Sequence, residues 1–368
     1  MAGRVVWRDE IESTQDLAFR CLHDHAAARE GDGDAWACVA ARRQTAGRGR
    51  RDRIWMSSHG TLMMTVARLD PVDSAPGFAA RSTSGRGAPG SNSTPLLPLL
   101  PLILGAAVAT RIEAILGGCW SNVAGRDQAV GSRALPRESL GRRFGLHWPN
   151  DLVIGDTKLG GFLVERRRIA VGGVWRWATA AGLGLNLFDA PDVPVSSGGR
   201  PAIDLRSAML AAGQLECGFA AGLSQAPEAP AGHAPAPNLS GEADRGCEAL
   251  LTALRDCVPG VAEPQHGSVL ERWAEALCIA MMSAWDECIP AISRSGTYDD
   301  ERPRRYWLEH WARLDVLRGV RVRVETPSGD REGVAMGIDG ASGALQVRDD
   351  DGELHPIHAG DVTRCRPV

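Results

Sequence analysis

The chain has 368 residues, of which 44% are hydrophobic and 23% are charged, and its formal net charge is −4 at pH 7. These values are typical of a globular protein with room for two domains, and they argue against a general nucleic-acid binder, which usually needs a basic surface. Nine cysteines without any CxxC pair predict reduced thiols in a cytoplasmic protein.

Targeting and membrane segments are not expected. The first twelve residues carry five charged side chains and no apolar core, so they do not resemble a signal peptide. The apolar run at 96–108 is interrupted by Pro98 and Pro101 and is too short to span a bilayer. We therefore expect no contact with a membrane.

The first third of the chain predicts alternating strands and helices. They are a strand at 5–7, a helix from 13 to about 29, strands at 36–41 and 61–69, and a helix at 99–116. Ser13 followed three residues later by Asp16 resembles a capping box and therefore predicts the start of the first helix. The free N–H groups at such a start also suit a polar or anionic ligand, although a plain helix cap is the simpler interpretation.

The second third predicts a hairpin and a long strand followed by helices. A strand from Phe144 is interrupted by Pro149, and Gly155-Asp156 separates it from a strand at 158–165. The later elements are a strand at 171–187 and helices at 205–215, 269–289 and 304–314.

The end of the chain changes to short alternating strands. They are expected at 320–325, 332–338, 344–348, 353–357 and 361–365, a density that predicts a small β-barrel. The chain therefore divides into a domain at 1–314 and a barrel at 319–368. Three Gly-, Pro- or Ala-rich segments, at about 70–95, 117–143 and 224–243, are predicted to be disordered inserts in the first domain.

One loop, at 42–55, stands out chemically. It holds six arginines, two glycines and a closing Trp55 within fourteen residues. Arginine forks match carboxylate and phosphate oxygens, and glycine lets the backbone approach a ligand closely. The loop alone fits an anion-wrapping lid, a solvated basic loop or an arginine run that binds RNA.

A second informative stretch is Trp148-Pro149-Asn150-Asp151, which precedes Lys158 and two glycines. Proline within a strand marks an edge, a bulge or a functional kink, and Asn150 and Asp151 would bring polar groups to it. A lysine at the start of a hairpin strand is usually solvated, but its closeness to Asp151 and to Gly160-Gly161 favours a site.

Together these stretches resemble the biotin–protein ligases, the family that attaches biotin to carboxylases. The resemblance rests on five motifs in the family's order, together with a barrel-like C-terminus at 333–345. The motifs are Ser13-Thr14, the loop from Gln44 to Arg51 with Trp55, Trp148-Pro149-Asn150-Asp151, Lys158-Leu159-Gly160-Gly161 and Gly182-Leu183-Gly184-Leu185-Asn186.

The resemblance implies an α/β (α+β) fold. It consists of a mixed β-sheet with flanking helices, similar to the catalytic core of class II aminoacyl-tRNA synthetases, followed by a small SH3-like barrel. It also implies an ATP-dependent ligase, which activates biotin to biotinyl-5′-AMP and transfers it to a lysine of a biotin carboxyl carrier domain, as in acetyl-CoA carboxylase. Biotin and ATP would be substrates, Mg²⁺ would accompany ATP, and no metal would be held by protein ligands alone.

Site roles carry over from the resemblance residue by residue. Lys158 would act electrostatically between the biotin carboxylate and the α-phosphate, and Arg50 would close the lid as a second catalytic cation. The residues expected to bind biotin or the adenylate are Ser13, Thr14, Gln15, Gln44, Gly47, Arg48, Gly49, Arg50, Arg51, Trp55, Trp148, Asn150, Asp151, Lys158, Gly160, Gly161 and Asn186. Asp151 could be a ligand of the Mg²⁺ that accompanies ATP or the base for the acceptor lysine. It is equally well interpreted as a residue that orders the kink and pairs with nearby cations.

Two departures from the family pattern bear on these expectations. Gln15 stands where the family usually has Asn, and Asp52 stands where it often has Gly. Because the motifs begin at Ser13, we also expect a ligase without an operator-binding repressor domain. A lipoate or octanoate protein ligase of the same fold is the nearest alternative, and an RNA-binding module is the alternative of another class.

Overall fold

The computed structural model describes residues 5–27, 35–70, 96–115, 144–193, 200–211, 269–288, 302–326 and 329–364. The predicted inserts at 117–143 and 224–243 lie outside the described residues, and so does the insert at 70–95 apart from Asp70. Asp70 accepts hydrogen bonds from Arg166 Nε at 2.6 Å and from Thr179 Oγ1 at 2.7 Å, so it belongs to the folded sheet.

A seven-stranded mixed sheet forms the centre of the segment predicted as the first domain, at 1–314. Its strand order is β1-β2-β3-β7-β6-β5-β4, in which β1 and β2 are parallel and all other neighbours are antiparallel. The strands are β1 (Val6–Ile11), β2 (Trp36–Gln44), β3 (Thr61–Leu69), β4 (Phe144–His147), β5 (Asp151–Ile154), β6 (Thr157–Val171) and β7 (Val174–Asn186). This confirms the predicted mixed sheet with flanking helices.

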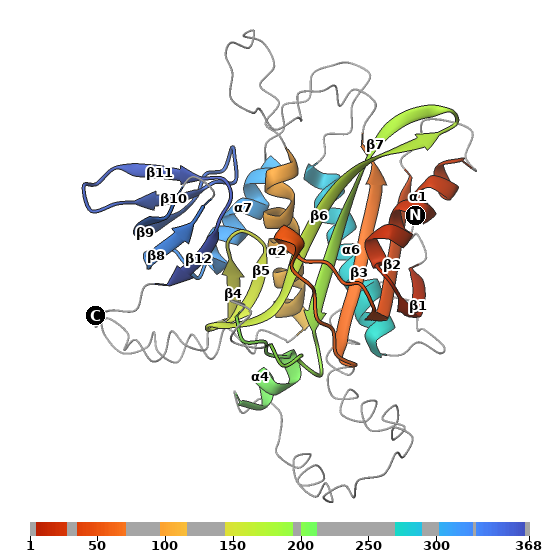
Figure 1. The fold of residues 1–368 in the computed structure, drawn as a ribbon, viewed down its shortest axis with the longest axis horizontal. Coiled ribbons are helices and arrows are strands. Elements are labelled where there is room, and N and C mark those ends of the chain that lie inside the picture. The colour runs from red at the N-terminus through yellow and green to blue at the C-terminus, as the bar shows by residue number, and fades with distance from the viewer. Residues whose placement is uncertain are drawn as a thin grey trace, which may run out of the picture.

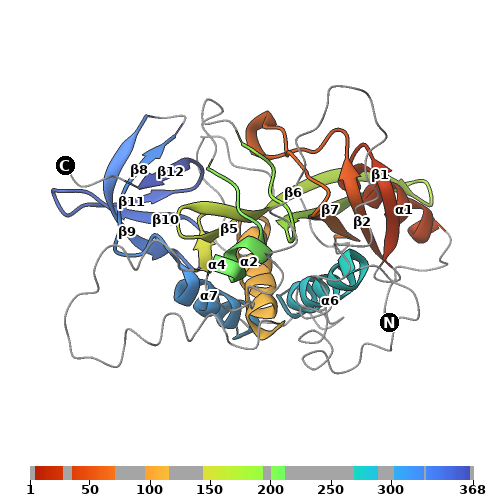
Figure 2. The same cartoon turned by 90° about the horizontal axis from the view of Figure 1, so that it is seen from below.

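The helices divide between the two faces of this sheet. Helix α1 (Thr14–Ala27) packs on the face that carries Val39, Ala67 and Ala180, because alternate residues of a strand point to opposite faces. The opposite face is covered by α2 (Leu96–Ile115), α6 (Val269–Cys288) and α7 (Arg302–Leu314). Figure 2 shows these three helices on one side of the sheet and the short helix η1 (Arg50–Asp52) on the other.

The core is concentrated under the three helices. Trp148, Trp273, Trp285 and Trp311 are almost fully buried there. Each buries a large apolar area, and burying a side chain of this kind stabilises the fold by about 2–3 kcal/mol. On the other face, among the described residues, α1 covers one end of the sheet and the loop at 45–55 lies over its middle.

The segment predicted as the second domain, at 319–368, contains a five-stranded antiparallel sheet. Its order is β11-β10-β9-β8-β12, built from β8 (Arg321–Glu325), β9 (Arg331–Ile338), β10 (Leu345–Arg348), β11 (Leu354–Ile357) and β12 (Asp361–Arg364). All five strands match the predicted positions to within a residue or so. The sheet lies beside β4 and α7 at one end of the molecule (Figure 1), and Trp148 Nε1 donates to Gly343 O at 2.9 Å across this junction.

Strand β6 is longer than predicted. It was expected at 158–165, but it continues to Val171 and turns back at Gly172 and Gly173, which both have positive φ. The arginines are compatible with a strand because their guanidinium groups lie over aromatic rings, Arg166 over Trp177 and Arg168 over Trp175. No helix in the described part of the chain is long and apolar enough to cross a membrane.

Candidate active site

Bare glycines form the floor of the candidate site on β6 and β7. A Cβ at Gly161 would lie 3.0 Å from Asp151 Oδ1 and 3.1 Å from Lys158 Nζ, and a Cβ at Gly182 would lie 2.9 Å from Gln15 Nε2. A Cβ at Gly184 would overlap the indole ring of Trp55. These positions need glycine because functional side chains lie directly against the strand backbone.

The loop at 45–55 lies over this floor, and backbone hydrogen bonds tie its N-terminal end to the end of β1 and close its two sides on each other. Thr45 N and Ala46 N donate to Ile11 O and Glu12 O, at 2.9 and 3.0 Å. Within the loop, Gly49 N donates to Arg53 O at 2.7 Å, and Trp55 N donates to Gly47 O at 3.0 Å. A Cβ at Gly47 would lie 2.6 Å from Trp55 O, so glycine is required for this closure.

At the tip of the loop, Arg51 adopts a left-handed conformation with φ 54° and ψ 46°. Non-glycine residues in this region are uncommon and often mark functional turns. The side chain of Asp52, the departure noted in the sequence, lies outside the described part of the chain.

Lys158 lies beneath the loop and pairs with Asp151. Its Nζ is 2.7 Å from Asp151 Oδ1 and 5.4 Å from the centroid of the Trp55 ring. A bulge between Leu152 and Val153 shifts the β5–β6 register, so that Gly160 faces Leu152 while Lys158 faces Val153. The bulge turns Lys158 towards Gly161 and Asp151, which a regular strand would not do.

Lys158 is also the only lysine in the sequence, and all its other permanently basic side chains are arginines. The backbone around it is fixed by a neighbouring segment, since Lys158 N donates to Pro201 O and Ile203 N donates to Lys158 O. The chain's single side-chain amine is therefore held in one place in the site.

The turn after the cis Trp148–Pro149 bond contacts the loop at 45–55 through the side-chain amide of Asn150. Asn150 Oδ1 accepts from Arg50 Nη1 at 3.3 Å, and Asn150 Nδ2 donates to Phe162 O. Asn150 thus links the lid arginine to β6. Sequence reasoning placed both residues in the site, and the structure brings them together.

A polar patch lines the end of the site at the start of α1. Gln44 Oε1 accepts from Thr14 N at 2.7 Å and from Thr14 Oγ1 at 3.1 Å, and Thr14 Oγ1 shares a hydrogen bond with Thr65 Oγ1. Gln15 Nε2 donates to Leu163 O at 2.8 Å. Several buried polar atoms of the described residues have no hydrogen-bond partner, and two of them, Gln15 Oε1 and Trp55 Nε1, belong to this site. A buried acceptor and donor left unpaired in one site are typical of groups that a ligand satisfies.

Arg48 is engaged with carboxylates rather than turned to open solvent. It contacts Asp16 on α1 and Glu165 on β6, and Arg167 contacts the same two carboxylates. The hydrogen bond from Arg48, opposed by burial and supported by Arg167, lowers the pKa of Asp16. The same pairing with Asp16 raises the pKa of Arg48, so both groups stay charged.

Three of the expected site residues are buried and make hydrogen bonds to other parts of the protein. Ser13 is buried and its carbonyl accepts from Leu17 N at the start of α1. Trp148 is buried and bonded to the second domain, as described above. Asn186 accepts from Thr61 Oγ1 at 3.2 Å and donates to Ile203 O at 3.3 Å. The ligand roles expected for all the site residues stay predictions.

Sequence reasoning missed several residues that the structure adds to the site. Asp16 was considered only as a helix cap, and Glu165, Arg167, Gly182 and Gly184 were given no site role. Alternation along β6 was the available signal, because Gly161, Glu165 and Arg167 share one face of a strand.

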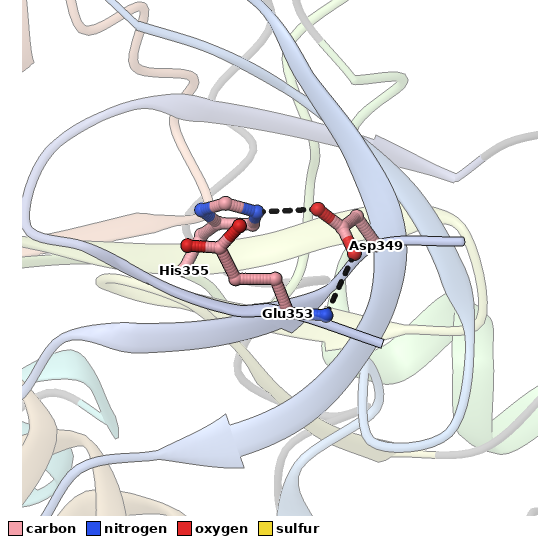
Figure 3. Close-up of side chains that lie close together, drawn as sticks. All are labelled: Asp349, Glu353 and His355. Atoms are coloured by element: carbon pink, nitrogen blue, oxygen red, sulfur yellow. Dashed lines mark hydrogen bonds and ion pairs between the residues drawn. The ribbon is translucent and has the colours of Figure 1, made fainter. Parts of the chain in front are cut away.

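A separate cluster of metal-ligating type lies in the second domain. Asp349, Glu353 and His355 have ligand atoms within 4.8 Å of one another at the turn between β10 and β11. Figure 3 shows that the Asp349 carboxylate is already used within the turn, accepting from His355 Nε2 at 2.6 Å and from Glu353 N at 2.8 Å. The cluster is therefore explained by closure of the turn.

Comparison with known proteins agrees with this architecture. Residues 28–84 match the biotin/lipoate A/B protein ligase family, and residues 319–363 match the biotin protein ligase C-terminal domain. A search of curated protein sequences gives no significant match.

Among solved structures, a mutant biotin protein ligase from Aquifex aeolicus in complex with biotin is 16% identical, with 100% of both chains covered and a TM-score of 0.51. The biotin protein ligase from Leishmania major in complex with biotin is 21% identical, with 97% of this chain and 98% of that chain covered and a TM-score of 0.40. A putative lipoate protein ligase from T. acidophilum with bound lipoic acid is 12% identical, with 75% and 94% covered and a TM-score of 0.29.

The Aquifex likeness establishes the class of fold, a mixed α/β domain followed by a small antiparallel sheet. The two matched segments, in this order on one chain with that fold, support the biotin–protein ligase family.

Proposed function

We propose that the chain is a biotin–protein ligase that joins biotin to ATP as biotinyl-5′-AMP and then transfers biotin to a carrier lysine. The observation that carries this proposal is the position of Lys158. Its amine lies between Asp151 and Trp55, above Gly161 and beneath an arginine-rich loop. This is a cationic, partly covered site in which two anions are brought together.

The first step joins two negatively charged groups. A carboxylate oxygen of biotin attacks the α-phosphorus of ATP, and the bond from that phosphorus to the bridging oxygen breaks to release pyrophosphate. Positive charge aimed at the developing phosphorane lowers the barrier. We assign this role to Lys158, with Arg50 held nearby by Asn150.

The second step is an acyl transfer. The carrier lysine, as a neutral amine, attacks the acyl carbon, the acyl–phosphate bond breaks, AMP leaves and one proton is lost from the new amide. A closed loop shields the mixed anhydride from water until the carrier arrives. Asp151 is a candidate acceptor of that proton, although its bond to Lys158 equally supports a purely positioning role.

The polar patch at Thr14, Gln15 and Gln44 suits the ureido head of biotin. Thr14 and Gln44 supply hydroxyl and amide groups, and the unpaired Gln15 Oε1 is an acceptor for an N–H group. The remaining residues proposed to line the ligand are Ser13, Gly47, Gly49, Arg51, Trp148, Gly160 and Asn186.

Mg²⁺ is proposed to enter with ATP, bound chiefly through phosphate oxygens. In the described residues, the cluster of metal-ligating side chains lies at Asp349 and not beside Lys158. We propose that the nucleotide carries the metal into the site.

The proposed acceptor is the biotin carboxyl carrier domain of a biotin-dependent carboxylase, and the proposed compartment is the cytoplasm. The free thiols of Cys21, Cys38, Cys278 and Cys288 fit a reducing compartment. No nucleic acid or membrane partner is proposed.

A lipoate or octanoate ligase is the second candidate, because the match at 28–84 covers both chemistries. The match at 319–363 to a biotin protein ligase domain favours biotin. The deciding experiment is ATP–pyrophosphate exchange with biotin, lipoate or octanoate as the only acid. Exchange that depends on biotin supports the proposal, and exchange with lipoate but not biotin overturns it.

A further inference from the structure

The strongest feature that the proposed reaction leaves unused is a closed cluster of four charged side chains. Arg48 comes from the loop neck, Asp16 from the first turn of α1, and Glu165 and Arg167 from one face of β6. Arg48 Nη1 and Nη2 donate to the two Asp16 oxygens at 2.8 and 3.2 Å, and Arg48 Nε and Nη2 donate to the two Glu165 oxygens at 3.2 and 3.1 Å.

Arg167 closes the cluster from the other side. Its Nη1 donates to Asp16 Oδ1 and its Nη2 to Glu165 Oε2, both at 2.7 Å. Its guanidinium also lies 4.7 Å from the centroid of the Phe19 ring on α1. The two cations and two carboxylates balance, so the cluster presents no net charge to a ligand.

The geometry of the cluster is stronger than that of ordinary surface ion pairs. Arg48 forms a two-pronged contact with each carboxylate, and the four side chains are only 24–41% exposed. Forked, charge-assisted bonds within a network hold one geometry, whereas an isolated exposed pair contributes little. The five donors of the Arg48 guanidinium are largely committed here.

The place of Arg48 in the loop explains what such a cluster would do. Arg48 lies between Gly47 and Gly49 and forms an isolated β-bridge with Ile54, so it stands where the two sides of the loop meet. Fixing its side chain to α1 and β6 therefore fixes the neck of the loop over the glycine floor. The tip, with exposed Arg51 and Arg53, lies beyond this point.

We propose that Arg48 is a positioning residue, whose guanidinium clamps the loop through Asp16, Glu165 and Arg167 and does not deliver charge to the adenylate. This rests on the proposed function, and it makes Asp16, Glu165 and Arg167 part of the machinery. Arg50 and Lys158 remain the cations that meet the ligand. Loss of the clamp lowers the fraction of closed loop, so it raises the KM values for biotin and ATP more than it lowers kcat.

The first test does not depend on the reaction. Hydrogen–deuterium exchange of a peptide spanning 45–55 is compared in the full chain and in the variants Arg48→Gln, Glu165→Gln and Asp16→Asn. All three are expected to exchange faster by about fivefold, because each removes part of the same network. The matched control is Arg321→Gln, which breaks a two-pronged pair with Asp350 in the second domain and should leave the peptide unchanged.

The second test reads the reaction itself. In biotin-dependent ATP–pyrophosphate exchange, all three variants should lose kcat/KM mainly through a higher KM. The double change Arg48→Gln with Glu165→Gln should be no worse than Arg48→Gln alone. Arg48→Lys should recover part of the lost kcat/KM. A collapse of kcat for Arg48→Gln, with Glu165→Gln and Asp16→Asn unaffected, would mean that Arg48 acts on the ligand directly, and it would overturn the clamp. Unchanged exchange of the 45–55 peptide in the three variants would also overturn it. If the parent protein shows no biotin-dependent reaction, the proposed function fails while the hydrogen-exchange result still decides the clamp.

Discussion

The indole ring of Trp55 lies directly on Gly184, at the point where any Cβ on that residue would overlap the ring. Trp55 closes the arginine-rich loop, and Gly184 is part of the floor formed by β6 and β7. One contact therefore joins two motifs that are more than a hundred residues apart, and it fixes how deep the loop lies in the site.

Substitution of Gly184→Ala should displace Trp55 and open the loop. Overpacking of this kind costs about 1–3 kcal/mol when the neighbours have to shift. We expect a lower free energy of unfolding, a change in tryptophan fluorescence and weaker biotin binding. Gly340→Ala is the matched control, since its nearest neighbour would be Leu308 Cδ1 at 3.8 Å. Tight biotin binding by Gly184→Ala would show that the contact does not set the site.

Substitution of Lys158→Met should remove adenylate formation while the fold is kept. Loss of one preorganised charge at a reacting phosphate is expected to lower kcat for ATP–pyrophosphate exchange by about 100- to 1,000-fold. Near-parental exchange, in a variant whose circular dichroism and melting temperature match the parent, would remove Lys158 from the first step.

Substitution of Arg50→Gly should release the adenylate before transfer. Arg50 contacts Asn150 at the edge of the lid, and a looser lid lets the mixed anhydride escape to amines in solution. We expect biotin on an added lysine-rich bystander protein, measured by mass spectrometry. Because Lys158 is the only lysine, the chain itself offers just that side-chain amine and its N-terminus, so self-labelling is read from the intact mass. A variant as selective as the parent would contradict the shielding role.

The pH dependence of stability should report on Asp16. Its folded pKa is lowered by Arg48, so its stabilising contribution is present above the unfolded value of about 4 and is lost as pH falls through the folded pKa. Asp16→Asn should be less stable than the parent at neutral pH, and the difference should shrink on acidification below about pH 4. Asp192→Asn, at an exposed position outside the cluster, is the control. A difference that stays constant with pH would mean that Asp16 is not ion-paired in solution.

The elements were predictable wherever hydrophobic periodicity and turn residues agree. The five strands of the second domain follow from alternation and from turns such as Asp351-Gly352, whereas the strand at 61–69 follows from its content of Met, Val and Leu. The length of β6 was not predictable, because a run of Glu165 and three arginines is typical of a loop. The run is stable as a strand because Arg166 and Arg168 lie over the rings of Trp177 and Trp175, a contact that the sequence alone does not show. Long-range pairing, including the parallel β1–β2 contact, leaves no local signal in the sequence.

The candidate site was partly predictable for a similar reason. Motif spacing identified Arg50, Asn150, Asp151 and Lys158, which the structure brings together. It missed the ion pairs of Arg48 with Asp16 and Glu165, because those contacts join three elements that are distant in sequence. The bulge that turns Lys158 towards Asp151 depends on register, which spacing along the chain does not determine.

Biotin transfer by the purified protein tests the proposed ligase activity. The chain is mixed with biotin, Mg·ATP and a biotin carboxyl carrier domain, and the intact mass of the carrier is measured with time. We expect one biotinyl group on one carrier lysine, dependent on ATP and lost with Lys158→Met. An unmodified carrier, with lipoate attached to a lipoyl domain under the same conditions, would contradict it.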